Sequence, residues 1–272
     1  MRKLKRINPA SLKTKALIFF ILIITLFAFS IPNNKPKIIH VYVALCDNIN
    51  QGIIPVSERL GNGEDPGNNL YWGALYGVKT HFKNSDDWKL LASLKNPQSD
   101  VLERCLFKSL EFNAFLVADA YRGKSIKKTI SDFLDAAAGK TLEQIKIQSG
   151  QNDFIIDAGG RSDLVAYVGH NGLMDFSLEE YPKGNNNHER EVIILACTSK
   201  KYFFDSIRKS GAYPLIWTTD LLAPEAYALK STLTGWLKEK SGEDVLNQTA
   251  RIYAKFQKCS LKAAEKLFAS GW

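Results

Sequence analysis

The sequence predicts an α/β fold in which a single doubly wound, mostly parallel sheet is flanked by helices. Short apolar runs rich in Val and Ile alternate along the chain with segments whose apolar residues recur at helical spacing. Such runs, bounded by Gly and polar residues, are typical of strands that are buried on both faces of a parallel sheet. Their alternation with helices favours helices on both faces of that sheet. The sequence shows neither an internal repeat nor a boundary for a second domain.

The individual elements follow from these patterns in chain order. We expect strands over residues 37–46, 112–120, 164–168, 192–196 and 212–217. We expect helices over residues 70–82, 125–138, 201–210, 225–238 and 245–268, several of which are followed by a glycine that can end them. Residues 52–69 contain Gly and Pro and are predicted to form a long loop. Residues 86–105 show a mixed pattern with a turn over 95–99, and residues 141–157 are compatible with a short hairpin or an edge strand.

The N-terminal residues 1–31 have the pattern of an export segment. A basic region precedes the apolar run Ala16–Phe29, and Ala28-Phe29-Ser30 offers small residues to a signal peptidase. The run is shorter than the ~20 residues of a typical spanning helix, but its extension to Ile31 permits a transmembrane anchor. We therefore predict a signal peptide or membrane anchor over 1–31 and one α/β domain over 32–272. That domain is expected outside the cytoplasm, where it is periplasmic, secreted or anchored to the membrane.

The formal net charge of +8 is concentrated in this N-terminal segment. Residues 1–30 contain six Lys and Arg and no Asp or Glu. The rest of the chain has 30 basic and 28 acidic residues, a net charge of +2. Binding to nucleic acid relies on a basic surface that this balance does not provide. We expect no nucleic-acid partner, and membrane contact only through the N-terminal segment if it is retained.

The chain contains four cysteines, Cys46, Cys105, Cys197 and Cys259. Their spacing is wide and irregular, and no pair forms a CxxC motif. An exported protein can oxidise four cysteines in three complete pairings, but a core of this size does not require disulfides. The spacing also argues against a zinc site. We expect no metal and no cofactor.

Two of the predicted strands end at reactive side chains. Leu164–Val168 is followed by Gly169-His170-Asn171-Gly172, and Val192–Ala196 is followed by Cys197. In open α/β sheets, function gathers in the crevice beyond the carboxyl ends of the strands. A histidine within reach of a cysteine can generate the thiolate and later protonate a leaving amine. We therefore predict that His170 is the general base and acid and that Cys197 is the nucleophile.

These two segments resemble the caspase-like cysteine peptidases, a family that includes gingipains, legumain and separase. The family ends one buried strand in His-Gly and the next in Ala-Cys, and Val165–Gly172 (VAYVGHNG) and Ile193–Cys197 (IILAC) stand in these places. Asn171 departs from the pattern, because the family has glycine directly after the histidine. The resemblance implies a divergent member, active or inactive, with a caspase-like fold. It also implies an oxyanion site formed by N–H groups of Cys197 and of Asn171 or Gly172.

Two carboxylates occupy positions at which this family recognises the substrate residue before the scissile bond. Asp47 follows the first expected strand, and Asp220 follows the last one. By the resemblance, these residues imply substrate binding that favours cleavage after Arg or Lys. Asp220 is also compatible with a capping or turn role. Asp175 is interpreted mainly as a turn residue and alternatively as a group that orients His170, and Cys46 as a buried core residue or a rival thiol.

Three functions remain open on this basis. The first is an exported cysteine endopeptidase that acts on a peptide or protein substrate. The second is a catalytically silent α/β envelope protein that binds a peptide, a glycan or a partner protein. The third is another hydrolase or transferase that uses Cys197 on a different substrate.

Overall fold

Eight strands form one mixed sheet in the computed structural model, which describes residues 35–149, 152–184 and 189–272, without the side chains of residues 147–154. Residues 36–272 belong to a single structural unit. The predicted export segment, residues 1–31, lies outside the described residues. Within the described part of the chain, no helix has both the length and the apolar character needed to cross a membrane.

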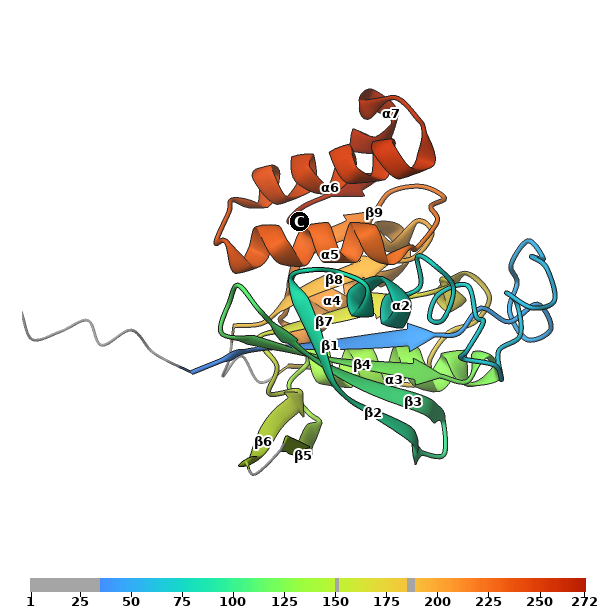
Figure 1. The fold of residues 1–272 in the computed structure, drawn as a ribbon. Coiled ribbons are helices and arrows are strands. Elements are labelled where there is room, and N and C mark those ends of the chain that lie inside the picture. Colours follow the sequence, from blue (N-terminus) through green and yellow to red (C-terminus); the bar gives the residue numbers. More distant parts are fainter. Residues whose placement is uncertain (1–34, 150–151, 185–188) are drawn as a thin grey trace, which may run out of the picture. The chain divides into compact units, whose positions relative to one another are not determined.

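The strands of the sheet lie in the order β10-β9-β8-β7-β1-β4-β3-β2 (Figure 1). Strands β9, β8, β7, β1 and β4 pair in parallel, whereas β3, β2 and β10 join the sheet by antiparallel pairing. Strands β5 and β6 form a separate two-stranded hairpin. The bounds are β1 Lys37–Ala44, β2 Trp88–Gln98, β3 Val101–Ser109, β4 Ala114–Tyr121, β5 Leu142–Ser149, β6 Asn152–Gly159, β7 Leu164–Val168, β8 Glu191–Leu195, β9 Tyr213–Thr218 and β10 Phe268–Ala269. The predicted α/β class is confirmed, with a mixed sheet.

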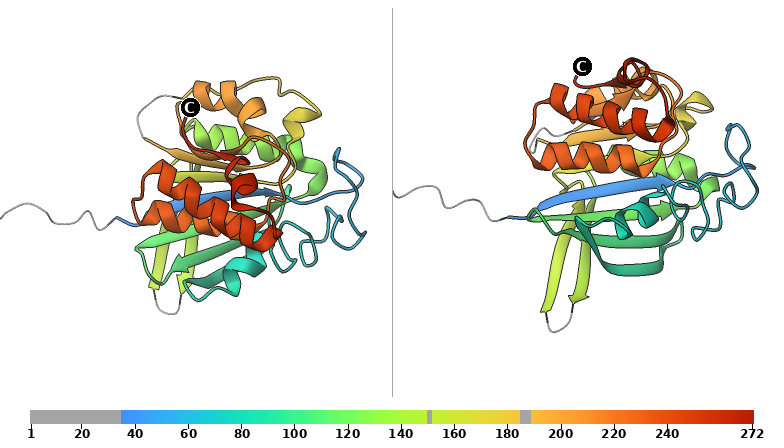
Figure 2. Two further views of the ribbon diagram at one scale, coloured as in Figure 1. Left: turned by 90° about the horizontal axis from the view of Figure 1, so that it is seen from above. Right: turned by 45° about the horizontal axis from the view of Figure 1, so that its top comes forward.

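Helices cover both faces of this sheet (Figures 1 and 2). On one face, Phe133 and Phe203 from α3 and α4 pack with Tyr167 of β7. On the other face, Leu229 from α5 packs in the same core as Ala166 of β7, together with residues of α2 and α6. Neighbouring strand residues belong to different cores because their side chains point to opposite faces. The helices are α2 Val78–Lys83, α3 Ile126–Ala137, α4 Ser199–Ser210, α5 Ala226–Leu237, α6 Gly242–Gln257 and α7 Leu261–Glu265, with short 3-10 turns η1 Gly123–Ser125 and η2 Gly172–Met174.

The register of the central strands determines which residues meet at the carboxyl edge. Val168 at the end of β7 pairs with Leu195 at the end of β8. On the other side of β7, Val168 pairs with Val43 of β1. The segments that follow β7 and β8 remain paired just beyond the strand ends, because the N–H of Gly169 donates a hydrogen bond to the carbonyl oxygen of Leu195 at 3.2 Å. The segments that follow β7 and β8 therefore leave the sheet side by side.

The helix predicted over residues 70–82 is shorter than expected and begins at Val78. Before it, the carbonyl oxygen of Asn69 accepts hydrogen bonds from three successive N–H groups of a turn, Trp72, Gly73 and Ala74. A Cβ at Gly73 would lie 2.2 Å from the carbonyl oxygen of Gly67. The preceding loop therefore packs directly against this segment, and this tertiary contact prevails over helical periodicity.

The helix predicted over residues 245–268 is divided into α6 and α7. Lys258 has a φ of 52°, in the left-handed region that ends a helix. The hydroxyl of Ser260 then accepts a hydrogen bond from the N–H of Ala263 at 3.2 Å and so caps α7. The apolar residues keep their helical spacing across this break, so the sequence pattern alone predicts one helix. Capping at Lys258 and Ser260 divides it into two.

Candidate active site

His170 and Cys197 occupy equivalent positions at the carboxyl ends of neighbouring strands. Each residue stands two places beyond its strand, after Val168 of β7 and after Leu195 of β8, and the two strands are parallel and in register. The sequence-based expectation that these two ends lie next to each other is therefore met by the structure. His170 is 8% exposed, and Cys197 is partly buried.

The imidazole of His170 is held by a carboxylate. Its Nε2 atom lies 2.5 Å from Oδ2 of Asp175, whose side chain is 38% exposed. The backbone of the histidine is also fixed, because the hydroxyl of Tyr167 donates a hydrogen bond to the carbonyl oxygen of His170 at 2.6 Å. With Nε2 bound to Asp175, Nδ1 is the ring nitrogen that has no hydrogen-bond partner among the described residues. Nδ1 is therefore the atom that can exchange a proton with a nucleophile or a substrate.

The loop after β1 also contacts this carboxylate. The N–H of Gly52 lies 3.4 Å from Oδ2 of Asp175. A Cβ at Gly52 would lie only 2.7 Å from Oδ1 of Asp175. Glycine is therefore needed at this position if the aspartate is to keep its place beside His170.

Cys197 lies in a tight turn between β8 and α4. The next residue, Thr198, has a φ of 50° and ψ of 34°, an uncommon left-handed conformation for a β-branched residue. Its N–H donates to the carbonyl oxygen of Asp220 at 3.0 Å. The thiol of Cys197 contacts the carbonyl oxygen of Leu222 at 3.7 Å. The nucleophile candidate is thus presented on a strained strand-to-helix turn that the segment after β9 supports.

The predicted oxyanion donors differ in their hydrogen bonding. The N–H groups of Cys197 and Asn171 have no hydrogen-bond partner among the described residues. The N–H of Gly172, by contrast, donates to the carbonyl oxygen of His170 at 3.1 Å. Gly172 is therefore occupied, and Asn171 is completely buried, which leaves the N–H of Cys197 as the remaining candidate donor to a developing negative charge.

The two predicted substrate-binding carboxylates differ in their surroundings. Asp47 is 4% exposed, and its Oδ1 accepts hydrogen bonds from the N–H groups of Ile49 at 2.9 Å and Asn50 at 3.1 Å. The amide of Asn50 also donates to Oδ2 of Asp47 at 2.8 Å. Asp220 is exposed, and its Oδ1 accepts from the N–H of Leu221 at 2.8 Å. Asp47 stabilises its own loop, whereas the carboxylate of Asp220 is open to solvent beside the turn of Cys197.

Tyr71, interpreted from the sequence as part of an aromatic core face, is buried in the hydrophobic core, and it also interacts electrostatically with two thiols. Burial raises the pKa of Tyr71, and its proximity to Cys46 and Cys197 raises the pKa further. Burial raises the pKa of Cys46 to about 11, although the neighbouring Tyr71 hydroxyl acts to lower it. Cys46 therefore stays a protonated thiol at neutral pH and is a poor nucleophile. Tyr71 and Cys197 are far apart along the chain, so the sequence alone does not show that they lie near each other.

A second cluster of ionisable residues lies inside the fold. His40, Asp119 and Glu143 place possible metal-ligand atoms within 4.8 Å of one another. The guanidinium of Arg104 already bridges them, with its Nη2 atom 2.6 Å from Asp119 and 2.5 Å from Glu143. The N–H of Gly159 donates to Nδ1 of His40 at 3.1 Å, which leaves the proton on Nε2 toward Asp119. The positive charge of Arg104 thus already balances the carboxylates of this cluster. The cluster is therefore better described as an internal ion-pair network than as a metal site.

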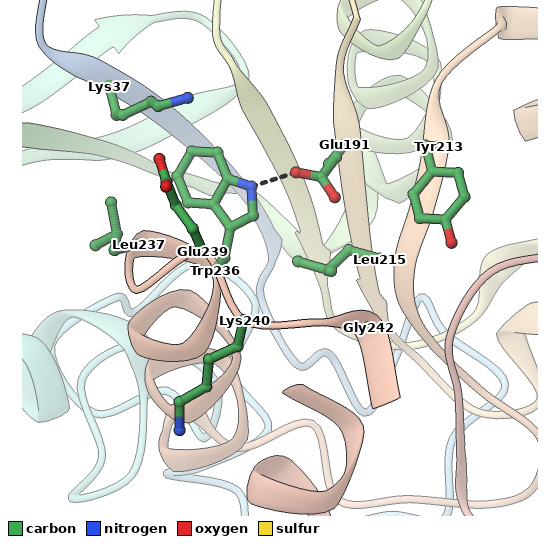
Figure 3. A pocket seen from close by; sticks show the side chains of 9 residues that line it. All are labelled: Lys37, Glu191, Tyr213, Leu215, Trp236, Leu237, Glu239, Lys240 and Gly242. Atoms are coloured by element: carbon green, nitrogen blue, oxygen red, sulfur yellow. Dashed lines mark hydrogen bonds between the residues drawn. The ribbon is translucent and has the colours of Figure 1, made fainter. Parts of the chain in front are cut away.

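The opposite edge of the sheet carries a distinct cavity of about 260 Å³. It lies at the amino ends of β1, β8 and β9, and Figure 3 shows the indole of Trp236 donating a hydrogen bond to Glu191 there. Burial raises the pKa of Glu191. Lys37 lies over the Trp236 ring at 5.4 Å from its centroid. This cavity is separated from His170 and Cys197 by the length of the central strands.

Comparison with known proteins gave no match, whether with family models, with curated proteins or with solved structures. The class defined by fold and geometry alone is an α/β protein with a large mixed sheet flanked by helices, in which a His–Asp pair and a cysteine lie at neighbouring strand ends.

Proposed function

We propose that this chain is an exported cysteine endopeptidase with a caspase-like fold. The observation that carries the proposal is the parallel, in-register pairing of β7 and β8, whose ends lead to His170 and Cys197. The bond between Nε2 of His170 and Asp175 supports it, because this bond leaves Nδ1 for proton transfer. The proposed domain covers residues 32–272 and is periplasmic, secreted or anchored through residues 1–31.

The chemistry follows from these groups. Nδ1 of His170 accepts the Sγ proton as the sulfur of Cys197 bonds to the scissile carbonyl carbon. The N–H of Cys197 binds the oxyanion of the tetrahedral intermediate. As the C–N bond breaks, His170 returns the proton to the leaving amine, and an acyl-enzyme thioester remains. A water molecule, deprotonated by His170, then releases the carboxylic acid and restores the thiol.

Substrate preference is proposed to involve basic residues. The resemblance to caspase-like peptidases implies recognition of the residue before the scissile bond by a group near the strand ends. Of the two carboxylates in such places, Asp220 is exposed, and its backbone carbonyl is bonded to Thr198, next to the nucleophile. An exposed carboxylate here favours Arg or Lys before the cleaved bond.

A catalytically silent envelope protein that binds a peptide, a glycan or a protein is the second candidate. One observation favours it, because the contact of the Cys197 thiol is with the carbonyl oxygen of Leu222, at 3.7 Å. In the peptidase proposal, a substrate displaces this weak contact, and the thiol turns toward His170.

The decisive experiment is labelling by a peptidyl chloromethyl ketone that ends in arginine. Cys259 is exposed and would react nonspecifically, so all variants carry Cys259→Ser. We expect mass spectrometry to find the label on Cys197, and Cys197→Ala to abolish it. His170→Ala should slow labelling by about 100-fold or more, since it removes the base. Peptidase activity is then measured with a fluorogenic peptide that ends in arginine. Unchanged labelling in Cys197→Ala, or none in the parent protein, rules out the peptidase and favours the silent binding protein.

A further inference from the structure

The side chain of Asn171 bridges the two turns that carry His170 and Cys197. It is completely buried. Its Nδ2 atom donates a hydrogen bond to the carbonyl oxygen of Cys197 at 2.6 Å. Since Asn171 directly follows His170 in the chain, this bond connects the loop after β7 with the turn after β8.

The peptide unit after the nucleophile is therefore held at both ends. Its carbonyl oxygen, from Cys197, is held by the amide of Asn171. Its N–H, from Thr198, is held by the carbonyl oxygen of Asp220 at 3.0 Å. This peptide unit leads into the left-handed conformation of Thr198, which is unfavourable for a β-branched residue and needs support from its surroundings. Holding this peptide unit restrains the ψ torsion of Cys197, the residue that carries both the thiol and the N–H.

The amide oxygen of Asn171 indicates that this side chain is not present to stabilise the fold. Oδ1 of Asn171 is buried and has no hydrogen-bond partner among the described residues. A buried acceptor without a partner is destabilising. The oxygen cannot exchange places with Nδ2, because it would then face the carbonyl oxygen of Cys197. Asn171 thus keeps a buried acceptor without a partner, while its Nδ2 donates one hydrogen bond to the turn that carries Cys197.

We propose that the Asn171 side chain is a positioning residue, which fixes the Cys197–Thr198 peptide so that thiol and oxyanion N–H are presented together. The inference rests on the proposed peptidase function and deepens it. It differs from the oxyanion role that the resemblance implies for the Asn171 backbone, because it concerns the side-chain amide and acts through Cys197. A glycine, which the resembling family has directly after its histidine, could not form this clamp.

The test uses the same arginine-ending chloromethyl ketone with the Cys259→Ser protein and measures kinact and KI separately. Asn171→Ala should lower kinact by about 10- to 100-fold, the order expected of a small misplacement of a reacting group. KI should change less than threefold, because substrate binding does not use this amide. Asn84→Ala serves as the control, since Asn84 is an exposed asparagine at the end of α2. It should leave both constants unchanged.

A second variant separates positioning from loss of folding. Asn171→Asp keeps the shape of the side chain, but an ionised carboxylate cannot donate to the Cys197 carbonyl. The protonated carboxyl can donate. At pH 5, where a buried carboxyl is protonated, kinact of Asn171→Asp should therefore exceed that of Asn171→Ala at least fivefold.

Three results would decide the matter. Labelling of the parent protein with unchanged kinact in Asn171→Ala overturns the positioning role and leaves the peptidase proposal intact. Equal kinact of Asn171→Asp and Asn171→Ala at pH 5, in proteins whose circular dichroism matches the parent, also overturns it. Absence of labelling in the parent protein refutes the peptidase proposal itself, and the positioning role falls with it.

Discussion

Nε2 of His170 lies 2.5 Å from Oδ2 of Asp175, only five residues further along the chain. The 3-10 turn η2 lies between the two residues and folds the chain back on itself. A carboxylate bound to one ring nitrogen fixes the tautomer and the orientation of a histidine. It also stabilises the imidazolium that forms when the other nitrogen takes up a proton. The pair therefore gives His170 the support that a catalytic base requires.

Replacement of Asp175 by asparagine tests this support. Asp175→Asn retains the shape of the side chain but removes the charge that stabilises the imidazolium. We expect kinact for the arginine-ending chloromethyl ketone to fall by roughly 10- to 100-fold, within the usual contribution of general acid–base catalysis.

Glu179→Gln is the matched control for this variant. Glu179 lies four residues beyond Asp175, its side chain is 93% exposed, and its ion pair with Lys127 is long, at 3.7 Å. Removing its charge should leave kinact within twofold of the parent. Equal effects of both variants would show that general electrostatics, and not orientation of His170, governs the rate.

Gly52 offers an independent perturbation of the same pair. The Cβ introduced by Gly52→Ala would lie 2.7 Å from Oδ1 of Asp175, so that either the loop or the carboxylate must move. We expect kinact to fall by about tenfold or more through displacement of Asp175. Gly67→Ala is the control, because its Cβ meets only Oδ1 of Asp65, at 3.1 Å, within the same loop. If Gly52→Ala labels at the parent rate, the contact between this loop and Asp175 does not contribute to the site.

The candidate pair was predictable from the sequence because it depends on strand ends. Buried strands have a strong apolar signal, and their parallel pairing places the residues that follow them at one edge. His170 and Cys197 could be placed from this rule alone, and the register of β7 and β8 agrees with it. The antiparallel strand β3 was not predicted because Glu103 and Arg104 interrupt its apolar run although it is buried. Strand β2 was not predicted because it lies at the edge of the sheet and most of its residues are at least partly exposed. Such a strand lacks a continuous apolar run.

The residues around His170 and Cys197 were harder to predict from the sequence than the two residues themselves. Asp175 was interpreted mainly as a turn residue, since a carboxylate five positions after a histidine reaches it only if the chain turns as η2 does. The contact of Asp175 with Gly52 spans 123 positions in the sequence. The approach of Tyr71 to Cys46 similarly depends on how the loop after β1 folds over the strand ends. Loop geometry of this kind is set by tertiary packing, which a single sequence does not display.

The four thiols are expected to differ sharply in reactivity. Cys46 and Cys105 are buried, and burial raises their pKa values to about 11 and about 12. Cys197 is partly buried and Cys259 is exposed. At pH 7.5, a disulfide reagent such as DTNB should therefore modify Cys197 and Cys259 in the native protein, and Cys46 and Cys105 only after unfolding in guanidinium. Peptide mapping of the modified protein locates each site. Rapid modification of Cys46 in the native protein would contradict its burial and make it a genuine rival of Cys197.

The buried carboxylate of Glu103 should make the stability of the fold depend on pH. Burial alone would raise the pKa of Glu103, but hydrogen bonds from Lys79, Ser93, Trp72 and Lys95 lower it to about 2. A carboxyl whose pKa is depressed by folding stabilises the protein above its ordinary pKa of 4.5. That stabilisation is lost as the pH falls from 4.5 toward 2.

Glu103→Gln should therefore lower the free energy of unfolding at pH 7 by roughly 1.5–3 kcal/mol, the range for hydrogen bonds to charged groups. Urea unfolding of variant and parent at pH 7, 5, 4 and 3 measures the difference. It should be constant between pH 7 and pH 5 and should shrink below pH 4.5, because the parent alone loses the contribution of an ionised Glu103. The exposed Glu179→Gln variant should show no difference at any of these pH values. A penalty in Glu103→Gln that is the same at pH 7 and pH 3 would mean that packing around the side chain, and not its charge, stabilises this part of the sheet.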